Sequence, residues 1–156
     1  MKTTVFEQIN RFNTAYAACI DDDRLESWPD FFADRCLYKV TTYDNHHNNM
    51  PAGLIYADSK AMLHDRISAL REANIYERQR YRHIMGMPLV QSESNDELVS
   101  ESAFQVTRIM RGGKMDLFAI GKYLDEFQRD GETLKLKKRI VVCDSISIDT
   151  LLAIPL

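Results

Sequence analysis

The chain has 156 residues, of which 45% are hydrophobic and 28% are charged, and its formal net charge is -3. These proportions are ordinary for a globular protein, and a chain of this length buries very roughly 70% of the surface that its unfolded form exposes. The sequence has no concentrated Lys/Arg stripe, so nucleic acid is not an expected partner. No linker or change of composition divides it, and we expect one domain over residues 1–156.

The apolar runs and the cysteines indicate where the protein acts. The longest apolar runs, such as Ile140–Cys143, are too short to span a bilayer. The N-terminal sequence MKTTVFEQINRF lacks the apolar region of a secretory signal. Cys19, Cys36 and Cys143 are widely spaced and form no CxxC or CxH pair. We therefore expect buried, reduced thiols in a cytoplasmic protein, rather than disulfides or a zinc site.

Three stretches in the first half of the chain have the apolar spacing of amphipathic helices. They cover Val5–Ile20, Leu25–Phe32 and the residues from Asp58-Ser59 to about Ala73, with Asp58 as the expected cap of the third. Thr3 or Thr4 is expected to cap the first helix, and Glu7 would complete a capping box with Thr4. Asp22 or Asp23 is expected to cap the second.

Between the second and third helices, the composition predicts strands around a loop. Cys36–Tyr43 is rich in β-branched and aromatic residues and predicts a strand. Asp44–Gly53 is polar, contains Pro and Gly, and predicts a loop. Leu54–Tyr56 predicts a short returning strand.

The second half of the chain alternates polar and apolar residues, which predicts long strands. They cover Arg80–Ser92, Glu97–Arg111, Lys114–Gln128 and Thr133–Asp144, with an extension over Ser147–Leu151. Gly86 and Pro88 predict a bulge in the first strand, and Gly112-Gly113 predicts a hairpin turn. Helices followed by a hairpin-connected sheet indicate an α+β fold. Strands of this length curl strongly, so we expect a cone-shaped sheet around the helices.

Few residues have a spacing that suggests chemistry. Asp44, His46 and His47 lie in the polar loop and could approach a metal in a 2-His-1-carboxylate manner, but the spacing supplies no third ligand. Among the carboxylates near strand ends (Asp58, Asp125, Asp144 and Asp149), the spacing does not select a general base. No GxSxG, P-loop, GxGxxG or HExxH motif occurs.

The RYRH run at the start of the first long strand supports two interpretations. Alternation places Arg80 and Arg82 on one face and His83 on the other. If His83 lies near Tyr38 or Asp44 inside the cone, these residues form an acid/base pocket, as in a stand-alone isomerase or dehydratase or in a protein that binds a small ligand. Otherwise His83 is a buried, hydrogen-bonded residue or part of a subunit contact.

Several runs in the second half of the sequence resemble a known family. They are RYRHIMG, FQVTRIMRGG and FAIGKYLDEFQRDGETLKLKKRIVVCDS, followed by LLAIPL. Their R-x-R-H, G-x-Y-x-D, D-G and R-x-V-x-x-D elements resemble, in this order, the β (small) subunit of aromatic-ring-hydroxylating Rieske non-haem iron oxygenases. The WPDFF, DNHHNN and LREANIYERQRYRH runs are most similar to subunits of enzymes that act on aromatic carboxylates, first terephthalate dioxygenase and then salicylate hydroxylase; benzoate is a third substrate of this kind.

The resemblance implies a cystatin/NTF2-like cone that assembles with a larger α subunit, commonly as an α3β3 hexamer in which the small subunits associate as a trimer. In such systems the α subunit carries a Rieske [2Fe–2S] cluster and a mononuclear iron, and a reductase delivers electrons from NAD(P)H to the complex. A Rieske cluster needs two Cys and two His, usually as CxH and CxxH, and this sequence has neither motif. We therefore expect a structural subunit of a dioxygenase, without catalytic, cofactor-binding or metal-binding residues of its own.

Two sets of residues follow from these interpretations. The candidates for a subunit contact are large polar residues on strands: Arg80, Arg82, His83, Tyr123 and Arg139. The candidates for the alternative pocket are Tyr38, Asp44 and His83.

Overall fold

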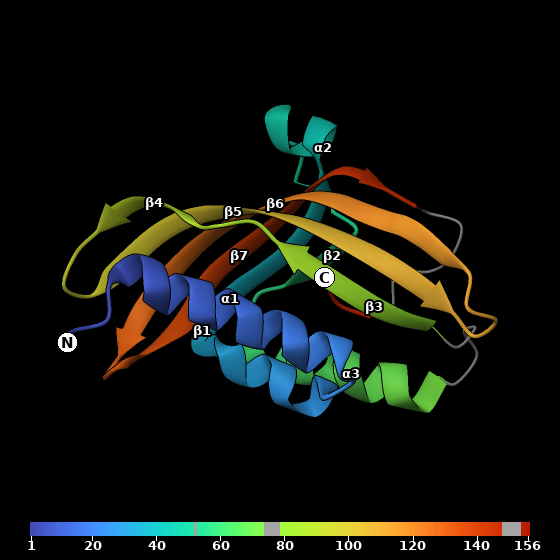
Figure 1. Ribbon diagram of the computed structural model, residues 1–156, viewed down its shortest axis with the longest axis horizontal. Coiled ribbons are helices and arrows are strands. Elements are labelled where there is room, and N and C mark those ends of the chain that lie inside the picture. Colours follow the sequence, from blue (N-terminus) through green and yellow to red (C-terminus); the bar gives the residue numbers. More distant parts are fainter. Residues whose placement is uncertain (52, 74–78, 148–153) are drawn as a thin grey trace.

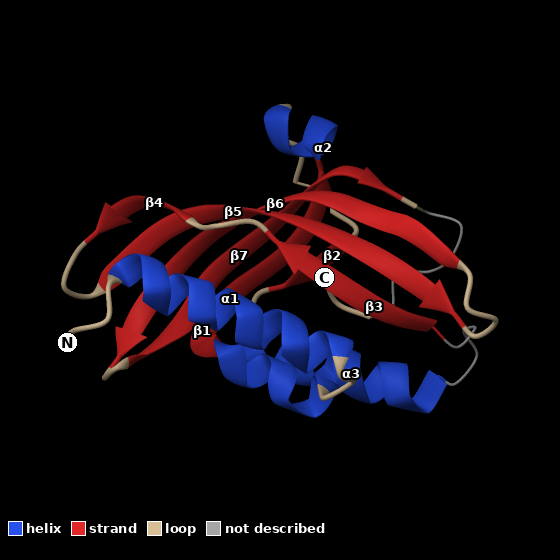
Figure 2. Ribbon diagram, in the orientation of Figure 1, coloured by secondary structure: helices blue, strands red, loops and turns tan. Residues whose placement is uncertain are grey.

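The computed structural model describes residues 1–51, 53–73, 79–147 and 154–156. Three helices lie together on one side of a curved sheet: α1 (Val5–Asp21), the 3₁₀ helix η1 (Leu25–Phe31) and α3 (Lys60–Ala73). A short helix, α2 (Tyr43–His47), stands on the opposite side of the sheet (Figure 1 and Figure 2). No helix in the described ranges is long and apolar enough to cross a membrane.

Within the described residues the sheet has seven strands and combines parallel and antiparallel pairs. Its strands are β1 (Phe32–Thr42), β2 (Ile55–Ala57), β3 (Gln79–Met85), β4 (Leu89–Glu93), β5 (Glu97–Met110), β6 (Met115–Asp130) and β7 (Thr133–Ile146). The order is β2-β1-β7-β6-β5-β3, and β4 also pairs with β5. Only β1 and β7 are parallel among the described pairs. The predicted α+β cone is confirmed: the sheet curves around the helical layer in Figure 1.

The first helix begins where its sequence predicts. Thr4 Oγ accepts a hydrogen bond from the Glu7 N–H at 3.2 Å, and the Glu7 carboxylate accepts one from the Thr4 N–H at 2.8 Å, which confirms the capping box. The predicted apolar stripe faces the sheet, because Ile9, Tyr16 and Ile20 are buried. The helix therefore covers the concave side of the strands.

The caps of the other two helices differ from the prediction. Neither Asp22 nor Asp23 caps η1, which follows Arg24 without a side-chain cap. Asp23 has a φ of 60° instead, a left-handed conformation that aspartate adopts more readily than most residues. Ser59, not Asp58, caps α3, since its hydroxyl accepts a hydrogen bond at 3.2 Å from the N–H three residues later.

The predicted loop over 44–53 was partly wrong. Its beginning is the helix α2, because Thr42 Oγ accepts a hydrogen bond from the Asn45 N–H at 3.2 Å and caps a turn there. The preceding strand also begins earlier than predicted, at Phe32 rather than Cys36, since Phe32 already pairs with Leu136 of β7.

The irregularity predicted at Gly86 and Pro88 lies where expected, but it is a break between two strands rather than a bulge within one. It divides the stretch 80–92 into β3 and β4, and the Gly86 N–H donates to the carbonyl of Ala103 at 2.8 Å. Both strands pair with β5, so the break bends one edge of the sheet without ending it. In the predicted extension over 147–151, the Ser147 N–H donates to the Phe118 carbonyl, and the rest lies outside the described residues.

Aromatic side chains form much of the core. Trp28, Phe32 and Tyr38 pack edge to face, with ring centroids 5.1 to 5.8 Å apart. Phe104 stacks on Tyr123 at 4.6 Å. These side chains bring the helical layer and the inner face of the sheet together, and each is at most 2% exposed.

Candidate functional site

A polar cluster lies inside the cone, on the inner face of β6 and β7. Arg139 forms two hydrogen bonds with the Asp125 carboxylate, from Nε and from Nη2, each at 2.8 Å. Arg139 Nη2 also donates to Asn13 Oδ1 at 2.6 Å, and Asn13 Nδ2 donates to Ser102 Oγ at 3.1 Å. We call these four residues the Arg139 cluster. It ties α1 to three strands of the sheet.

Aromatic rings enclose the guanidinium group of Arg139. Its Cζ lies 4.1 Å from the ring centroid of Tyr123 and 4.3 Å from that of Tyr16, distances at which a cation and a ring attract each other. Neither the Arg139 nor the Asp125 side chain is exposed. Burial raises the pKa of Asp125, and the neighbouring guanidinium opposes that rise. A carboxylate in this position neutralises a buried cation and has no access to a substrate.

A second buried polar pair connects α1 with β3. His83 Nδ1 lies 2.6 Å from Asp21 Oδ1, and the His83 N–H donates to Asp21 Oδ2 at 2.8 Å. The two side chains are 0% and 3% exposed. A cavity of about 990 Å³ lies beside the pair, and Asp21, Arg80 and Tyr81 line it, but His83 does not. His83 therefore faces the interior, in agreement with the second of the two interpretations of the RYRH run, and links α1 to β3.

The structure does not bring the three alternative pocket residues together. Tyr38 is on β1 and His83 is on β3, and β7, β6 and β5 lie between these strands. Asp44 is exposed on α2, which stands on the other side of the sheet from the helical layer (Figure 1). The prediction of an acid/base site from Tyr38, Asp44 and His83 is not supported, because the curvature of the sheet does not bring their elements to one place.

Three of the five contact candidates lie in the interior. Tyr123 and Arg139 have no exposed surface, and His83 is 6% exposed. Their side chains are therefore unavailable to a partner, because alternation turns them toward the helical layer. Arg80 and Arg82 are exposed and stay candidates for a subunit contact.

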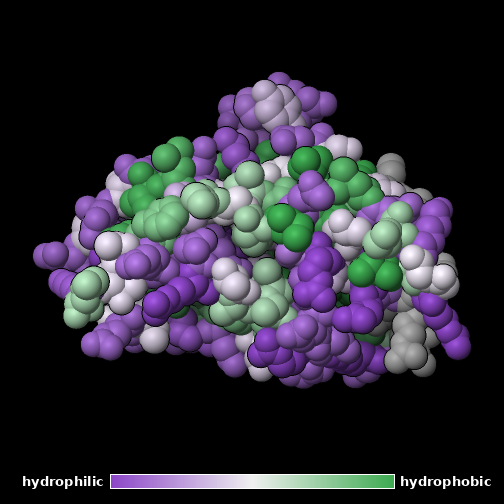
Figure 3. Space-filling view, viewed as in Figure 1, coloured by the Kyte–Doolittle hydropathy of each residue, from purple (hydrophilic) through white to green (hydrophobic). Residues whose placement is uncertain are grey.

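The exposed arginines belong to a partly apolar outer face of β3, β5 and β6. Arg82 of β3 is in register with Leu117 of β6 through the strand between them, β5. In the same way, Ile84 of β3 is in register with Ile120 of β6. Ile84 and Leu117 are 58% and 57% exposed, respectively. Figure 3 shows hydrophobic surface gathered over the strands, whereas the surface over the helices is mainly hydrophilic. An exposed apolar sheet face of this kind is a candidate interaction surface.

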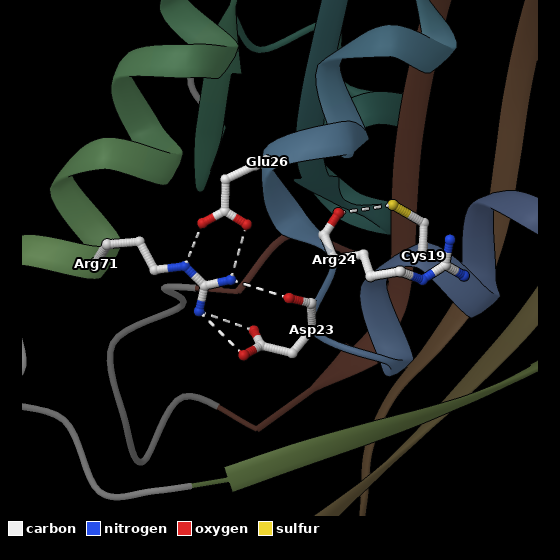
Figure 4. Close-up of polar contacts among 5 residues, drawn as sticks. All are labelled: Cys19, Asp23, Arg24, Glu26 and Arg71. Atoms are coloured by element: carbon white, nitrogen blue, oxygen red, sulfur yellow. Dashed lines mark hydrogen bonds and ion pairs between the residues drawn. The ribbon is translucent and has the colours of Figure 1, made fainter.

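An arginine on α3 ties the helical layer together (Figure 4). Arg71 binds the Glu26 carboxylate through Nε and Nη2 at 2.7 and 3.1 Å. Its Nη1 donates to both carboxylate oxygens of Asp23 at 2.9 and 3.0 Å, and Nη2 donates to the Asp23 carbonyl at 2.9 Å. Beside it, Cys19 Sγ donates to the carbonyl of Arg24 at 2.9 Å. These contacts hold the turn between α1 and η1.

Replacing Arg71 with methionine should lower the free energy of unfolding at neutral pH by up to about 1 kcal/mol, because both carboxylates are largely exposed. Arg71 lowers the pKa of Glu26 below its ordinary 4.5. Its stabilising effect is therefore present above that pH and is lost as the pH falls through the lowered value. Urea unfolding at neutral and acidic pH measures this. Arg24→Met is the control, because Arg24 and Asp22 are 3.5 Å apart and more than half exposed; an equal loss in both variants would contradict the prediction.

The described side chains do not gather as a metal site. Within residues 1–51, 53–73, 79–147 and 154–156, no three His, Cys, Asp or Glu side chains lie close enough to hold an ion. Cys19, Cys36 and Cys143 are buried free thiols. Burial raises the pKa of Cys143 to about 12, so this thiol is protonated at neutral pH. The sequence prediction of buried, small side chains at these positions is confirmed.

The comparisons with known proteins agree over nearly the whole chain. A family model described as ring hydroxylating beta subunit matches residues 15–150. The beta 1 subunit of the terminal oxygenase component of terephthalate 1,2-dioxygenase from Comamonas sp is 52% identical over 149 residues, covering 96% of this chain and 97% of that protein. The small subunit of anthranilate 1,2-dioxygenase from Burkholderia cepacia is 32% identical, with 96% and 92% covered.

A solved structure has the same fold at high similarity. It is described as the beta subunit of an aromatic-ring-hydroxylating dioxygenase from Novosphingobium aromaticivorans, is 40% identical and has a TM-score of 0.89. The match covers 97% of this chain and 96% of that chain.

Proposed function

The chain belongs to the ring-hydroxylating β subunits, which are parts of dioxygenase complexes, and on this premise we propose that it is the structural subunit of an oxygenase for an aromatic carboxylate. The named relatives are subunits of a terephthalate dioxygenase and an anthranilate dioxygenase, and both of these compounds are aromatic acids. The substrate of this complex is accordingly an acid of the terephthalate, salicylate or benzoate kind.

The arrangement of the interior is the observation that supports a structural role for this chain. The buried ionisable groups that a pocket enzyme would use are engaged with one another: Arg139 with Asp125, and His83 with Asp21. Aromatic rings fill the space between the helices and the sheet. General acid or base catalysis requires a group within hydrogen-bond reach of a substrate, and these side chains lack the exposure for that.

The redox cofactors belong to the large partner subunit in this proposal. Rieske ligation requires two cysteines and two histidines in one place, and the described cysteines of this chain lie apart, on α1, β1 and β7. The large subunit therefore holds the [2Fe–2S] cluster and the mononuclear iron, and a reductase passes it electrons from NAD(P)H. The assembly is an α3β3 hexamer in the cytoplasm, with the small subunits associated as a trimer.

The contact with the large subunit is proposed on the outer face of β3 and β6. Arg80 and Arg82 supply exposed donors there, beside the exposed side chains of Ile84 and Leu117. Apolar anchors beside arginines are typical of the energetically important part of an interface. The helical layer lies on the opposite side of the sheet and does not cover this face (Figure 1).

A binding measurement tests that contact. Ile84→Glu and Leu117→Glu should each weaken the complex with the large subunit at least about tenfold, because a charge would be buried against the partner. The control is Met62→Glu on α3, where the side chain is 38% exposed on the helical side. Pull-down of the tagged large subunit, quantified over a titration, measures the affinity. If the sheet variants bind as tightly as the control, the contact lies elsewhere.

A further inference from the structure

The main chain of Leu156 is held inside the cone by two tyrosine side chains. Its main-chain oxygen accepts hydrogen bonds from Tyr16 Oη and Tyr38 Oη, each at 2.8 Å. Its N–H donates to Tyr38 Oη at 3.0 Å. Leu156, Tyr16 and Tyr38 have no exposed surface. Two hydroxyl groups from different elements, α1 and β1, therefore converge on one oxygen in a closed environment.

The side chains around this oxygen present hydrogen-bond donors to a ligand. Burial raises the pKa of Tyr16 and raises that of Tyr38 well above its ordinary value, so both hydroxyls stay protonated and act as donors. Arg139 lies behind Tyr16, with its Cζ 4.3 Å from the ring centroid. Arg139 Nη1 has no hydrogen-bond partner within the described ranges. Two neutral donors that converge on one point suit a carboxylate oxygen.

The residues around this site are apolar and can contact the apolar part of a ligand whose oxygen binds to the two tyrosines. Leu156 belongs to the same apolar cluster as Trp28, Phe32 and Tyr38. The centroid of the Tyr38 ring lies 5.1 Å from that of Trp28 and 5.8 Å from that of Phe32, in edge-to-face contact.

We propose that this aromatic cage is a binding site for a small carboxylic acid with an apolar body, and that the chain's own Leu156 occupies it. A benzoate-sized acid would present one oxygen to Tyr16 and Tyr38 and its ring to Trp28. A tethered segment has an effective concentration of the order of millimolar or more. The acid therefore competes poorly while the segment is in place and binds once it is withdrawn. This inference does not depend on the subunit role proposed above.

The test removes the occupant and compares two matched probes. A chain that lacks Pro155 and Leu156, checked for folding by circular dichroism, should bind benzoate at least about tenfold more tightly than the full chain does. In the shortened chain, Tyr16→Phe with Tyr38→Phe should weaken benzoate binding about tenfold or more and leave toluene binding unchanged, since only the acid uses the hydroxyl groups. Titration followed by NMR measures both affinities. Equal effects on benzoate and toluene would overturn the proposal.

A second measurement uses the full chain and decides the matter if the shortened chain fails to fold. Raising benzoate to about 100 mM should move the methyl resonances of Leu156 toward the positions of an exposed leucine, because the acid displaces it. Sodium chloride at the same ionic strength should leave them in place. Methyl resonances of Leu156 that stay unchanged in benzoate would show that the cage does not accept the acid.

Discussion

Replacing Arg139 with methionine should lower the free energy of unfolding by about 3–5 kcal/mol, because Asp125 would be left as an unpaired carboxylate in the interior. Methionine keeps most of the length of the side chain, so the loss reports the missing charge and hydrogen bonds rather than a large cavity. Asn13 would also lose its donor, which now lies 2.6 Å from Oδ1. Urea unfolding of the purified chain measures the difference.

The loss in Arg139→Met should depend on pH. Without the guanidinium, nothing opposes the rise that burial causes in the pKa of Asp125. A carboxyl with a raised pKa in the folded state contributes stability below its unfolded pKa, and that contribution is lost as the pH rises. The variant should therefore be closer to the parent chain at about pH 5 than at about pH 7.5.

The neighbouring lysine provides the control for that experiment. Lys138 lies 3.4 Å from Glu126, and both side chains are about 40% exposed. Lys138→Met should cost less than about 1 kcal/mol. If Arg139→Met costs no more than this control at neutral pH, the buried cluster is not what holds α1 to the sheet.

Replacing Gly121 with alanine should destabilise the chain by about 3 kcal/mol or more, because the added methyl group would overlap the neighbouring backbone. An ideal Cβ at this position would lie 1.9 Å from the carbonyl oxygen of Val142 and 2.9 Å from Cys143 Cα. Both atoms are main chain of β7, so β6 and β7 would have to separate. Thermal and urea unfolding, with hydrogen exchange of the β6–β7 amides, measure the effect.

Gly112 offers a matched control for the same substitution. It lies in the turn between β5 and β6, and an added Cβ there would meet no heavy atom within 4 Å. Gly112→Ala should change the free energy of unfolding by no more than about 0.5 kcal/mol. Equal losses in the two alanine variants would show that the close approach of β6 and β7 at Gly121 is not what excludes a side chain.

The motifs that carried the family resemblance are explained by the packing of β6 against β7. Gly121 pairs with Cys143, and Asp125 pairs with Arg139. The G-x-Y-x-D and R-x-V-x-x-D elements are therefore opposite one another in the sheet. Their spacing of two residues turns Tyr123 and Asp125 to the same inner face. Motifs that the sequence suggested as family markers thus form the folded core.

Strands and long helices were predictable because their signals are local. The capping box of Thr4 and the turn at Gly112-Gly113 need only neighbouring residues. The helix α2 was missed because its polar residues carry no apolar periodicity, although Thr42 before it is a recognisable cap. Its position on the far side of the sheet separates Asp44 from the helical layer.

The burial of the charged candidates was harder to predict because it depends on contacts between distant residues. His83 meets Asp21 across 62 positions, and Arg139 meets Asn13 across 126. The sequence did contain one signal of this burial. Arg139 alternates with Val141 and Cys143, so it lies on the apolar face of its strand. Large polar residues on strands were therefore a poor guide to the surface, and only Arg80 and Arg82 stayed exposed.

The most direct test of the structural role is to express the large subunit with and without this chain. Size-exclusion chromatography with light scattering, iron analysis and turnover of terephthalate, salicylate and benzoate would be measured on both preparations. With the chain, we expect a stable complex of equal copies of both subunits, containing the iron and active on one of these acids; without it, we expect incomplete assembly and low turnover. Full assembly and full turnover of the large subunit alone would contradict the structural role.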